Sequence, residues 1–108
     1  MNDEQTDKVL ELVVFALKDG TTREQFMGTV DGVTRWIRSQ PGFMSYDLSY
    51  SAEEHKWVFS AWWQTMQQAK AAAEAATSAP ENAPMFALID MDTMLYLHAE
   101  AATAPVTA

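Results

Sequence analysis

Few side chains in this sequence could carry polar chemistry. Tyr46, Tyr50 and Tyr96 are phenols that could hydrogen-bond a phenolic ligand or hold its anion. His98 could act as a general base, because the free imidazole titrates near neutral pH. A simpler interpretation stays open for each, since buried tyrosines commonly just satisfy their hydroxyls and histidines near strand ends are commonly solvated. We take Tyr46, Tyr96 and His98 as the candidate polar groups of an active site.

The motifs of several other chemistries are missing from the sequence. There is no cysteine, so thiolate nucleophiles and cysteine-ligated metals are excluded. His55 lies among charged residues of a predicted turn, far from His98, and no carboxylates stand at ligand spacing from either histidine. The sequence also contains no nucleophile elbow and no glycine-rich phosphate loop. We therefore predict neither a metal nor a cofactor.

Length and charge narrow the class of protein. A chain of 108 residues with 48% hydrophobic residues predicts one folded domain. The net charge of -8 and the scattered seven Lys and Arg argue against nucleic-acid binding and against an anionic membrane surface. No apolar run approaches the roughly 20 residues of a membrane span. The first residues are polar and acidic, unlike a signal peptide, so we expect a cytoplasmic location.

The candidate site must be positioned by a strand that leads directly into a helix. Residues 56–63 are rich in aromatic and β-branched types, which favour a strand, and they include Trp57, Trp62 and Trp63. Thr65 and Gln68 then have the spacing of a capping box at a helix start. Alanines follow, and alanine has the highest helix propensity. This junction is the centre of the predicted fold.

The first predicted strand, residues 8–17, is apolar on both faces. Such a strand is covered on both sides in the folded protein. A single layer of helices can cover one side only, so we expect a second subunit to cover the other. The sequence therefore predicts a homodimer.

A helix is predicted from Thr21 or Thr22, each of which starts a possible capping box, to about residue 39. Its apolar stripe is spaced four, three and four residues apart, as one buried helical face requires: Phe26, Val30, Val33, Ile37. Gly28 and Gly32 lie on the other side of this helix. They are either tolerated surface glycines or mark the close approach of another chain.

The remaining elements complete the order β-α-β-β-α-β. Residues 43–50 and 90–99 alternate as strands do, and a polar turn at residues 51–55 joins the second strand to the third. The segment 85–89 is predicted as a short helical turn. We predict a domain over residues 8–100, a disordered lead-in over 1–7 and a flexible tail over 101–108. The order is that of an α+β, ferredoxin-like fold, an antiparallel sheet with its helices on one face.

Aromatic residues of the third strand could line a cavity. Trp63, Phe59 and Trp57 share one face of this strand, and small alanines of the following helix lie opposite them. Such a space would suit a flat, polycyclic, largely apolar ligand, although core packing explains the same pattern. The candidate ligand-binding residues are apolar side chains of this strand and of both helices: Trp57, Phe59, Trp62, Met66, Phe26.

The chain resembles the antibiotic biosynthesis monooxygenase (ABM) family of the dimeric α+β barrel superfamily. The resemblance rests on three segments: VLELVVFAL, the helical segment that ends in Pro41-Gly42-Phe43, and AWWQTMQQAKAA with Trp63 at the strand end. It covers roughly residues 8–100. It implies that two sheets pack face to face in a dimeric barrel, and that Trp63 stands where the family places a tryptophan.

The resemblance implies three possible activities. Some members of the family oxidise phenols or anthrones with dioxygen and no cofactor, and Trp63 would then join the candidate catalytic residues. Haem-degrading members use an asparagine on the first strand and a histidine on the second helix, whereas this chain has no asparagine in that strand and alanines at positions 71–73. Other members have no assigned activity. We therefore expect a cofactor-independent monooxygenase of an aromatic small molecule, with a non-catalytic ligand-binding or structural protein as the alternative.

Overall fold

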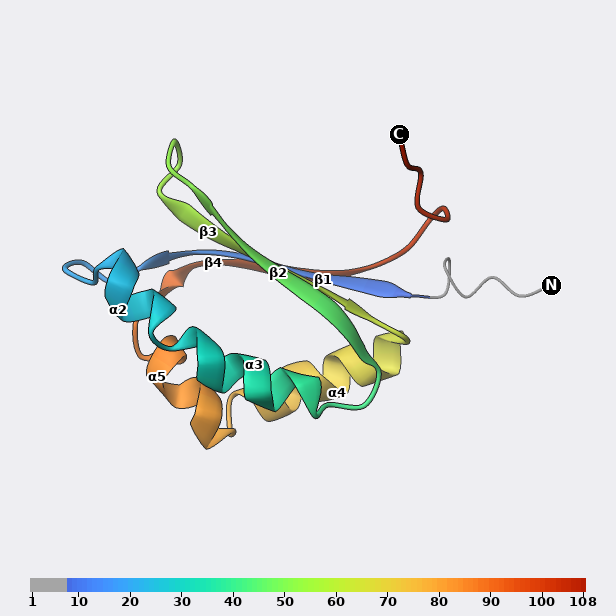
Figure 1. Ribbon diagram of the computed structural model, residues 1–108, viewed down its shortest axis with the longest axis horizontal. Helices are drawn as coiled ribbons and strands as arrows, with labels where there is room; N and C mark the ends of the chain where they lie inside the picture. Colours follow the sequence, from blue (N-terminus) through green and yellow to red (C-terminus); the bar gives the residue numbers. More distant parts are fainter. Residues whose placement is uncertain (1–7) are drawn as a thin grey trace.

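The computed structural model describes residues 8–108 and shows a four-stranded antiparallel sheet. The predicted lead-in, residues 1–7, lies outside the described residues. The strands are β1 (Val9–Leu17), β2 (Phe43–Ser51), β3 (Lys56–Trp63) and β4 (Ile89–Glu100). They lie in the order β2-β3-β1-β4, and all the helices lie on one side of the sheet (Figure 1). The predicted α+β, ferredoxin-like fold is confirmed.

The helical layer consists of short segments. They are α2 (Arg23–Met27), α3 (Val30–Arg38), α4 (Met66–Ala76), η1 (Pro80–Asn82) and α5 (Ala83–Phe86). At the start of α4, the Thr65 hydroxyl oxygen accepts the backbone N–H of Gln68 over 3.1 Å, as the sequence predicts. The helical turn predicted for residues 85–89 is α5, which begins two residues earlier.

The first predicted helix is two helices. Of the two possible capping boxes, the one of Thr22 and Gln25 forms, with both reciprocal hydrogen bonds in place. The chain leaves helical hydrogen bonding around Gly28 and Thr29, where the Thr29 hydroxyl donates to the Phe26 carbonyl over 2.6 Å. A side chain that bonds the backbone in this way competes with the helix ladder. The buried stripe of Phe26, Val33 and Ile37 nevertheless continues across the break.

Gly32 marks a close approach, but within the same chain. A Cβ at Gly32 would lie 2.8 Å from the carbonyl oxygen of Glu81 in η1. Glycine is therefore needed for α3 to pack directly against the η1 backbone. At Gly28 a Cβ would meet only atoms of the preceding turn, at 3.4 and 3.5 Å.

β-Bulges in two strands place two methionines on other faces than strict alternation would. The β2–β3 register shifts between Phe43 and Ser45, so Phe43 lies opposite Trp63 and Met44 is exposed. The β1–β4 register shifts between Val14 and Ala16, and the Thr93 hydroxyl accepts the N–H of Ala16 over 2.9 Å. Strict alternation along residues 90–99 would place Met91 on the same face as Leu95 and Leu97. In the structure Met91 instead lies beside Met94 on the helix side of the sheet.

The two faces of the sheet differ. The face toward the helices holds the core, which has two clusters: one around Trp63, Val9 and Ile37, the other around Phe15, Phe26 and Trp57. The opposite face carries apolar side chains that no element of residues 8–108 covers, and Leu95 and Leu97 there are 61% and 44% exposed. Residues 101–108 form neither helix nor strand, and their flexibility stays a prediction.

Candidate active site

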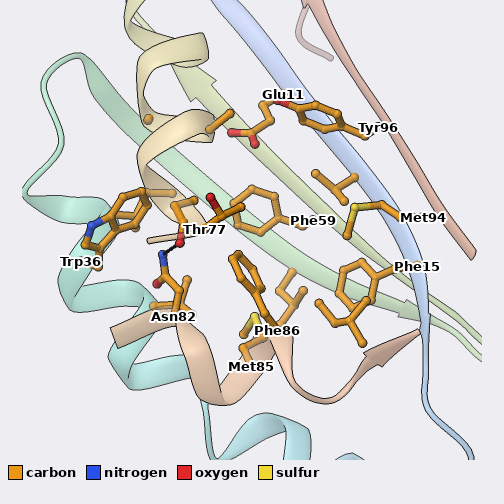
Figure 2. A pocket seen from close by; sticks show the side chains of 18 of the residues that line it. Glu11, Phe15, Trp36, Phe59, Thr77, Asn82, Met85, Phe86, Met94 and Tyr96 are labelled. Carbon is orange, nitrogen blue, oxygen red and sulfur yellow. Dashed lines mark hydrogen bonds between the residues drawn. The ribbon is translucent and has the colours of Figure 1, made fainter. Parts of the chain in front are cut away.

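A cavity of about 220 Å³ lies between the sheet and the helices. Phe15 and Phe59 form the wall on the sheet side, and Phe86 comes from α5 (Figure 2). Ala73 and Ala76 line the cavity from α4. The alanines leave this space because their side chains end at Cβ, whereas the facing aromatic rings hold the layers apart. The combination of small helix residues and an aromatic strand, seen in the sequence, therefore does produce a cavity.

The one carboxyl group that residues 8–108 place on the cavity wall is Glu11, the third residue of β1. Glu11 is 9% exposed and Trp63 is 1% exposed. The Trp63 indole N–H donates to Oε1 of Glu11 over 3.0 Å, and within residues 8–108 it is the only donor to this carboxyl. Burial raises the pKa of Glu11, because the apolar surroundings disfavour the charged form, and the Trp63 hydrogen bond offsets part of this shift. Glu11 is thus a carboxyl group with one oxygen held and the other unpaired beside the cavity.

Tyr96 and His98 lie at the mouth of the cavity. Tyr96 is 46% exposed and lines both the cavity and an outer groove formed with His98 and Lys70. Its hydroxyl is 3.4 Å from Nε2 of His98. Burial and the nearby Glu11 raise the pKa of Tyr96, so its phenol stays protonated at neutral pH. Burial and the charge of Lys70 lower the pKa of His98, which therefore stays neutral there.

Asn82 and Thr77 lie at the end of the cavity away from Glu11 (Figure 2). The Asn82 amide donates to the carbonyl of Ala76 over 3.1 Å and so closes the C-terminal end of α4. Its own oxygen is buried and has no partner among the described residues. The Asn82–Ala76 hydrogen bond therefore joins α4 to η1 at this end of the cavity.

The structure brings together some of the predicted site residues and separates others. Trp63, Phe59 and Tyr96 line the cavity, and His98 lies just outside it. Tyr46 is not on the cavity wall: its hydroxyl bonds to Thr34, and its ring stacks on Phe59 with the centroids 5.3 Å apart.

The remaining candidates for ligand contact lie elsewhere. Trp57 and Phe26 pack on each other in the second core cluster, with ring centroids 4.6 Å apart. Met66 packs against the first core cluster. Trp62 pairs with Leu10 on the open face of the sheet, where the Lys8 ammonium lies 4.7 Å from its ring centroid.

Glu11 was missed by the reading of the sequence, although a signal was present. It is the one charged residue within Val9–Leu17, and it stands on the parity of Val9 and Phe15, which face the core. A buried carboxyl in an otherwise apolar strand is costly unless it is bonded, so its position alone indicates a special role. The periodicity of this strand is defined by its apolar residues alone, so Glu11 is absent from the site residues predicted from the sequence.

Within residues 8–108, no three His, Asp or Glu side chains lie close enough together to hold a metal ion. In the same part of the chain, no helix has the length and apolarity needed to cross a membrane. The polar side chains on the cavity wall are Glu11, bonded to the Trp63 indole, together with Thr77, Asn82 and Tyr96.

Comparison with known proteins identifies the fold. No family model and no curated protein matches the sequence. SnoaB, a cofactor-independent oxygenase from Streptomyces nogalater, matches the structure with a TM-score of 0.72 at 18% identity, covering 90% of this chain and 95% of SnoaB. A candidate antibiotic biosynthesis monooxygenase of Bordetella bronchiseptica matches with a TM-score of 0.75 at 12% identity. The match covers 90% of this chain and 99% of the Bordetella protein.

A dimeric ferredoxin-like protein of unknown function from Thermobifida fusca also matches, with a TM-score of 0.68 at 10% identity, covering 86% of this chain and 90% of that one. The protein thus has the fold of the antibiotic biosynthesis monooxygenases, and the resemblance noted in the sequence is confirmed at the level of the fold. At 10–18% identity these likenesses establish fold alone.

Proposed function

We propose that this protein is a cofactor-independent monooxygenase of the ABM type, which oxidises a small aromatic molecule with dioxygen. The observation that carries the proposal is the aromatic-walled cavity that ends on the buried Glu11–Trp63 pair. The fold shared with SnoaB, a cofactor-independent oxygenase, supports it.

In the proposed reaction the substrate loses a proton, and the resulting anion passes one electron to dioxygen. The two radicals then combine to form the new C–O bond. For a CH₂ group that becomes a carbonyl, one dioxygen is consumed and one water is released. The protein would exclude water from the anion and hold the ring beside Phe59. Because the Trp63 N–H is already bonded to Glu11, the Tyr96 hydroxyl is the donor best placed to stabilise a substrate oxyanion.

The size and charge of the cavity narrow the substrate class. A dry cavity of about 150 Å³ holds one benzene ring. The cavity here, at about 220 Å³, would hold one ring or two fused rings, with any larger part of the ligand in the mouth beside Tyr96. Glu11 would repel a carboxylate placed in the cavity. The proposed substrate is therefore a neutral phenol or aryl ketone of one or two enclosed rings, smaller than the polycyclic ligand that the sequence suggested.

We also propose that the protein is a homodimer that pairs through the open face of the sheet. Leu95 and Leu97 are exposed there, beside half-buried Leu12 and Val14 of β1. The match to a dimeric protein of the same fold supports this arrangement. Leu97→Lys should convert the dimer to monomer in light scattering after size exclusion, whereas Met27→Lys, on exposed α2, should not. A monomeric wild type would overturn the dimer.

Oxygen uptake tests the proposed activity. Uptake is measured with chelator and no added cofactor, over a panel of naphthols, hydroquinones and anthrones. The variant Ala76→Leu places a larger side chain in the cavity, whereas the matched Ala75→Leu changes the exposed side of the same helix. We expect uptake by the wild type and by Ala75→Leu, and a loss of at least about tenfold in Ala76→Leu.

Two other outcomes have distinct meanings. Equal uptake by the wild type and Ala76→Leu would show that the cavity is not the site of oxygenation. Binding of panel compounds without any uptake would favour the alternative, a non-catalytic protein that binds a small aromatic ligand in the same cavity.

A further inference from the structure

We infer that Glu11 is the catalytic base of this site, which takes the proton of an activated C–H or O–H group of the substrate through its free oxygen Oε2. This inference rests on the proposed function for the identity of the cavity as an active site. In the step itself, the substrate X–H bond breaks, its electron pair stays on the substrate, and the proton forms an O–H bond on Glu11. The carboxylate becomes a neutral acid and the substrate an anion.

The first argument is position. Glu11 lies on the cavity wall near the start of β1, and Figure 2 shows its carboxyl group among the side chains around the cavity. Trp63 donates to Oε1 only, so the indole holds one carboxyl oxygen and Oε2 has no partner in residues 8–108. An acceptor that is fixed on one side and free on the other has the geometry that a general base needs.

The second argument is the lack of a competing base. Of the residues that line the cavity, only Glu11 and Tyr96 can titrate, and the raised pKa of Tyr96 keeps that phenol protonated. His98 lies in the outer groove rather than on the cavity wall. Of the candidate polar groups within residues 8–108, Glu11 alone can accept a proton inside the cavity at neutral pH.

The third argument is the electrostatic environment. The titratable groups that face Glu11 come from β4, namely Tyr96 and His98, with Lys70 of α4 in the groove beyond them. The neighbouring residues of β3, Ala61 and Trp63, carry no charge. No cation pairs directly with the carboxylate among the described residues, so its proton affinity is not reduced by an ion pair. Burial raises the pKa of Glu11 and so makes it a stronger base than a solvated glutamate.

Hydrogen–deuterium exchange tests this step apart from oxygen chemistry. The probes are anthrone and 2-tetralone, whose CH₂ groups are acidified by a ring and a carbonyl. Each is incubated without dioxygen in deuterium oxide, and loss of the CH₂ proton signal is followed by NMR. We expect the wild type to accelerate exchange, and Glu11→Gln to lower the protein-catalysed rate about 10²-fold or more. The matched variant Glu54→Gln, in the exposed β2–β3 turn, should match the wild type.

A second variant and a spectroscopic signal separate a base from a positioning residue. Glu11→Asp keeps a carboxylate, so this variant should still catalyse measurable exchange. Its exchange rate should rise with pH as the carboxyl group loses its proton, as in the wild type. The Trp63 indole N–H signal, which reports ionisation of Glu11 through their hydrogen bond, should titrate at the same pH as the exchange rate of the wild type.

Each outcome bears on one proposal or the other. Exchange that is as fast in Glu11→Gln as in the wild type overturns the assignment of Glu11, and so does a wild type that accelerates exchange of neither probe. If exchange depends on Glu11 but no panel compound supports oxygen uptake, Glu11 remains the assigned base and the proposed oxygenase activity is wrong. If Glu11→Gln leaves oxygen uptake unchanged, the oxygenase activity stands and the assignment of Glu11 as its base is wrong.

Discussion

The indole N–H of Trp63 and Oε1 of Glu11 are joined by a hydrogen bond of 3.0 Å, in which both residues are buried and stand 52 positions apart in the chain. The pair links the end of β3 to the first part of β1 on the helix side of the sheet. It explains why a charged residue can occupy the core of an apolar strand, since the carboxylate keeps one strong donor after it loses water.

Trp63→Phe should destabilise the protein through Glu11. The phenyl ring keeps much of the packing but leaves the carboxylate without its donor. A hydrogen bond to a charged group contributes about 1.5–3 kcal/mol. In a double-mutant cycle with Glu11→Leu, which removes the acceptor, we expect a coupling energy of that size in urea unfolding at pH 8. Free energies that add within about 0.5 kcal/mol would mean that the pair contributes no stability of its own.

The pH dependence of stability should show the cost of ionising Glu11. The pKa of this carboxyl is raised in the folded protein above the model value of 4.5, so between the two pKa values the folded state binds more protons than the unfolded state. Stability therefore falls as the pH rises from about 4.5 through the folded pKa and then levels off.

The matched measurement uses Glu11→Gln, which has no proton to lose at this position. The difference in unfolding free energy, variant minus wild type, should increase over that pH range and stay constant above it. A difference that is flat with pH, or that decreases, would contradict the raised pKa.

Gly32→Ala and Gly28→Ala should change stability in opposite directions. A Cβ at Gly32 would lie 2.8 Å from the Glu81 carbonyl oxygen, so alanine must separate α3 from η1, at a cost of about 1–3 kcal/mol. At Gly28 the backbone is helical and the space is ordinary, so alanine should stabilise by about 0.4–1 kcal/mol. Thermal unfolding of the two variants beside the wild type checks this, and equal melting temperatures would contradict the close contact.

Tyr96→Phe and Tyr46→Phe should separate catalysis from structure. Tyr96 is half exposed at the cavity mouth, so loss of its hydroxyl should change stability by less than about 0.5 kcal/mol. If that hydroxyl stabilises the substrate oxyanion, kcat should fall about 10²-fold with KM little changed. Tyr46→Phe breaks the bond to Thr34 and should instead cost about 1 kcal/mol of stability. Steady-state oxygen uptake measures kcat and KM, and urea unfolding measures stability. An unchanged kcat in Tyr96→Phe would show that the Tyr96 hydroxyl does not stabilise the substrate oxyanion.

Much of the fold could be predicted because local signals and global structure agree. Thr65 begins the helix that the sequence assigns to it, and Thr22, one of the two candidate starts, begins α2. The stripe of Phe26, Val33 and Ile37 is buried as its spacing requires. The aromatic β3 and the small residues of α4 also indicated the cavity. These features depend on neighbours within a few residues, which a single sequence displays.

The features of the fold and site that the sequence did not predict depend on which strands pair and in what register. The bulges at Met44 and near Met91 arise from pairing with β3 and β1, and no local pattern marks them. Likewise the role of Gly32 required knowledge that η1 packs against α3. Glu11 differs from these, because its place in an apolar strand was visible, but its partner Trp63 could be named only once β1 and β3 were aligned.

The wide separation of Glu11, Trp63 and Tyr96 along the chain also sets an order of events during synthesis. The strand that holds Glu11 leaves the ribosome first, and its carboxylate stays hydrated until Trp63 has followed. The mouth cannot form until β4, the last strand, pairs beside β1. If this carboxylate loses its water before the folding transition state, refolding in vitro should be faster in mild acid, where Glu11 enters the core as a neutral group.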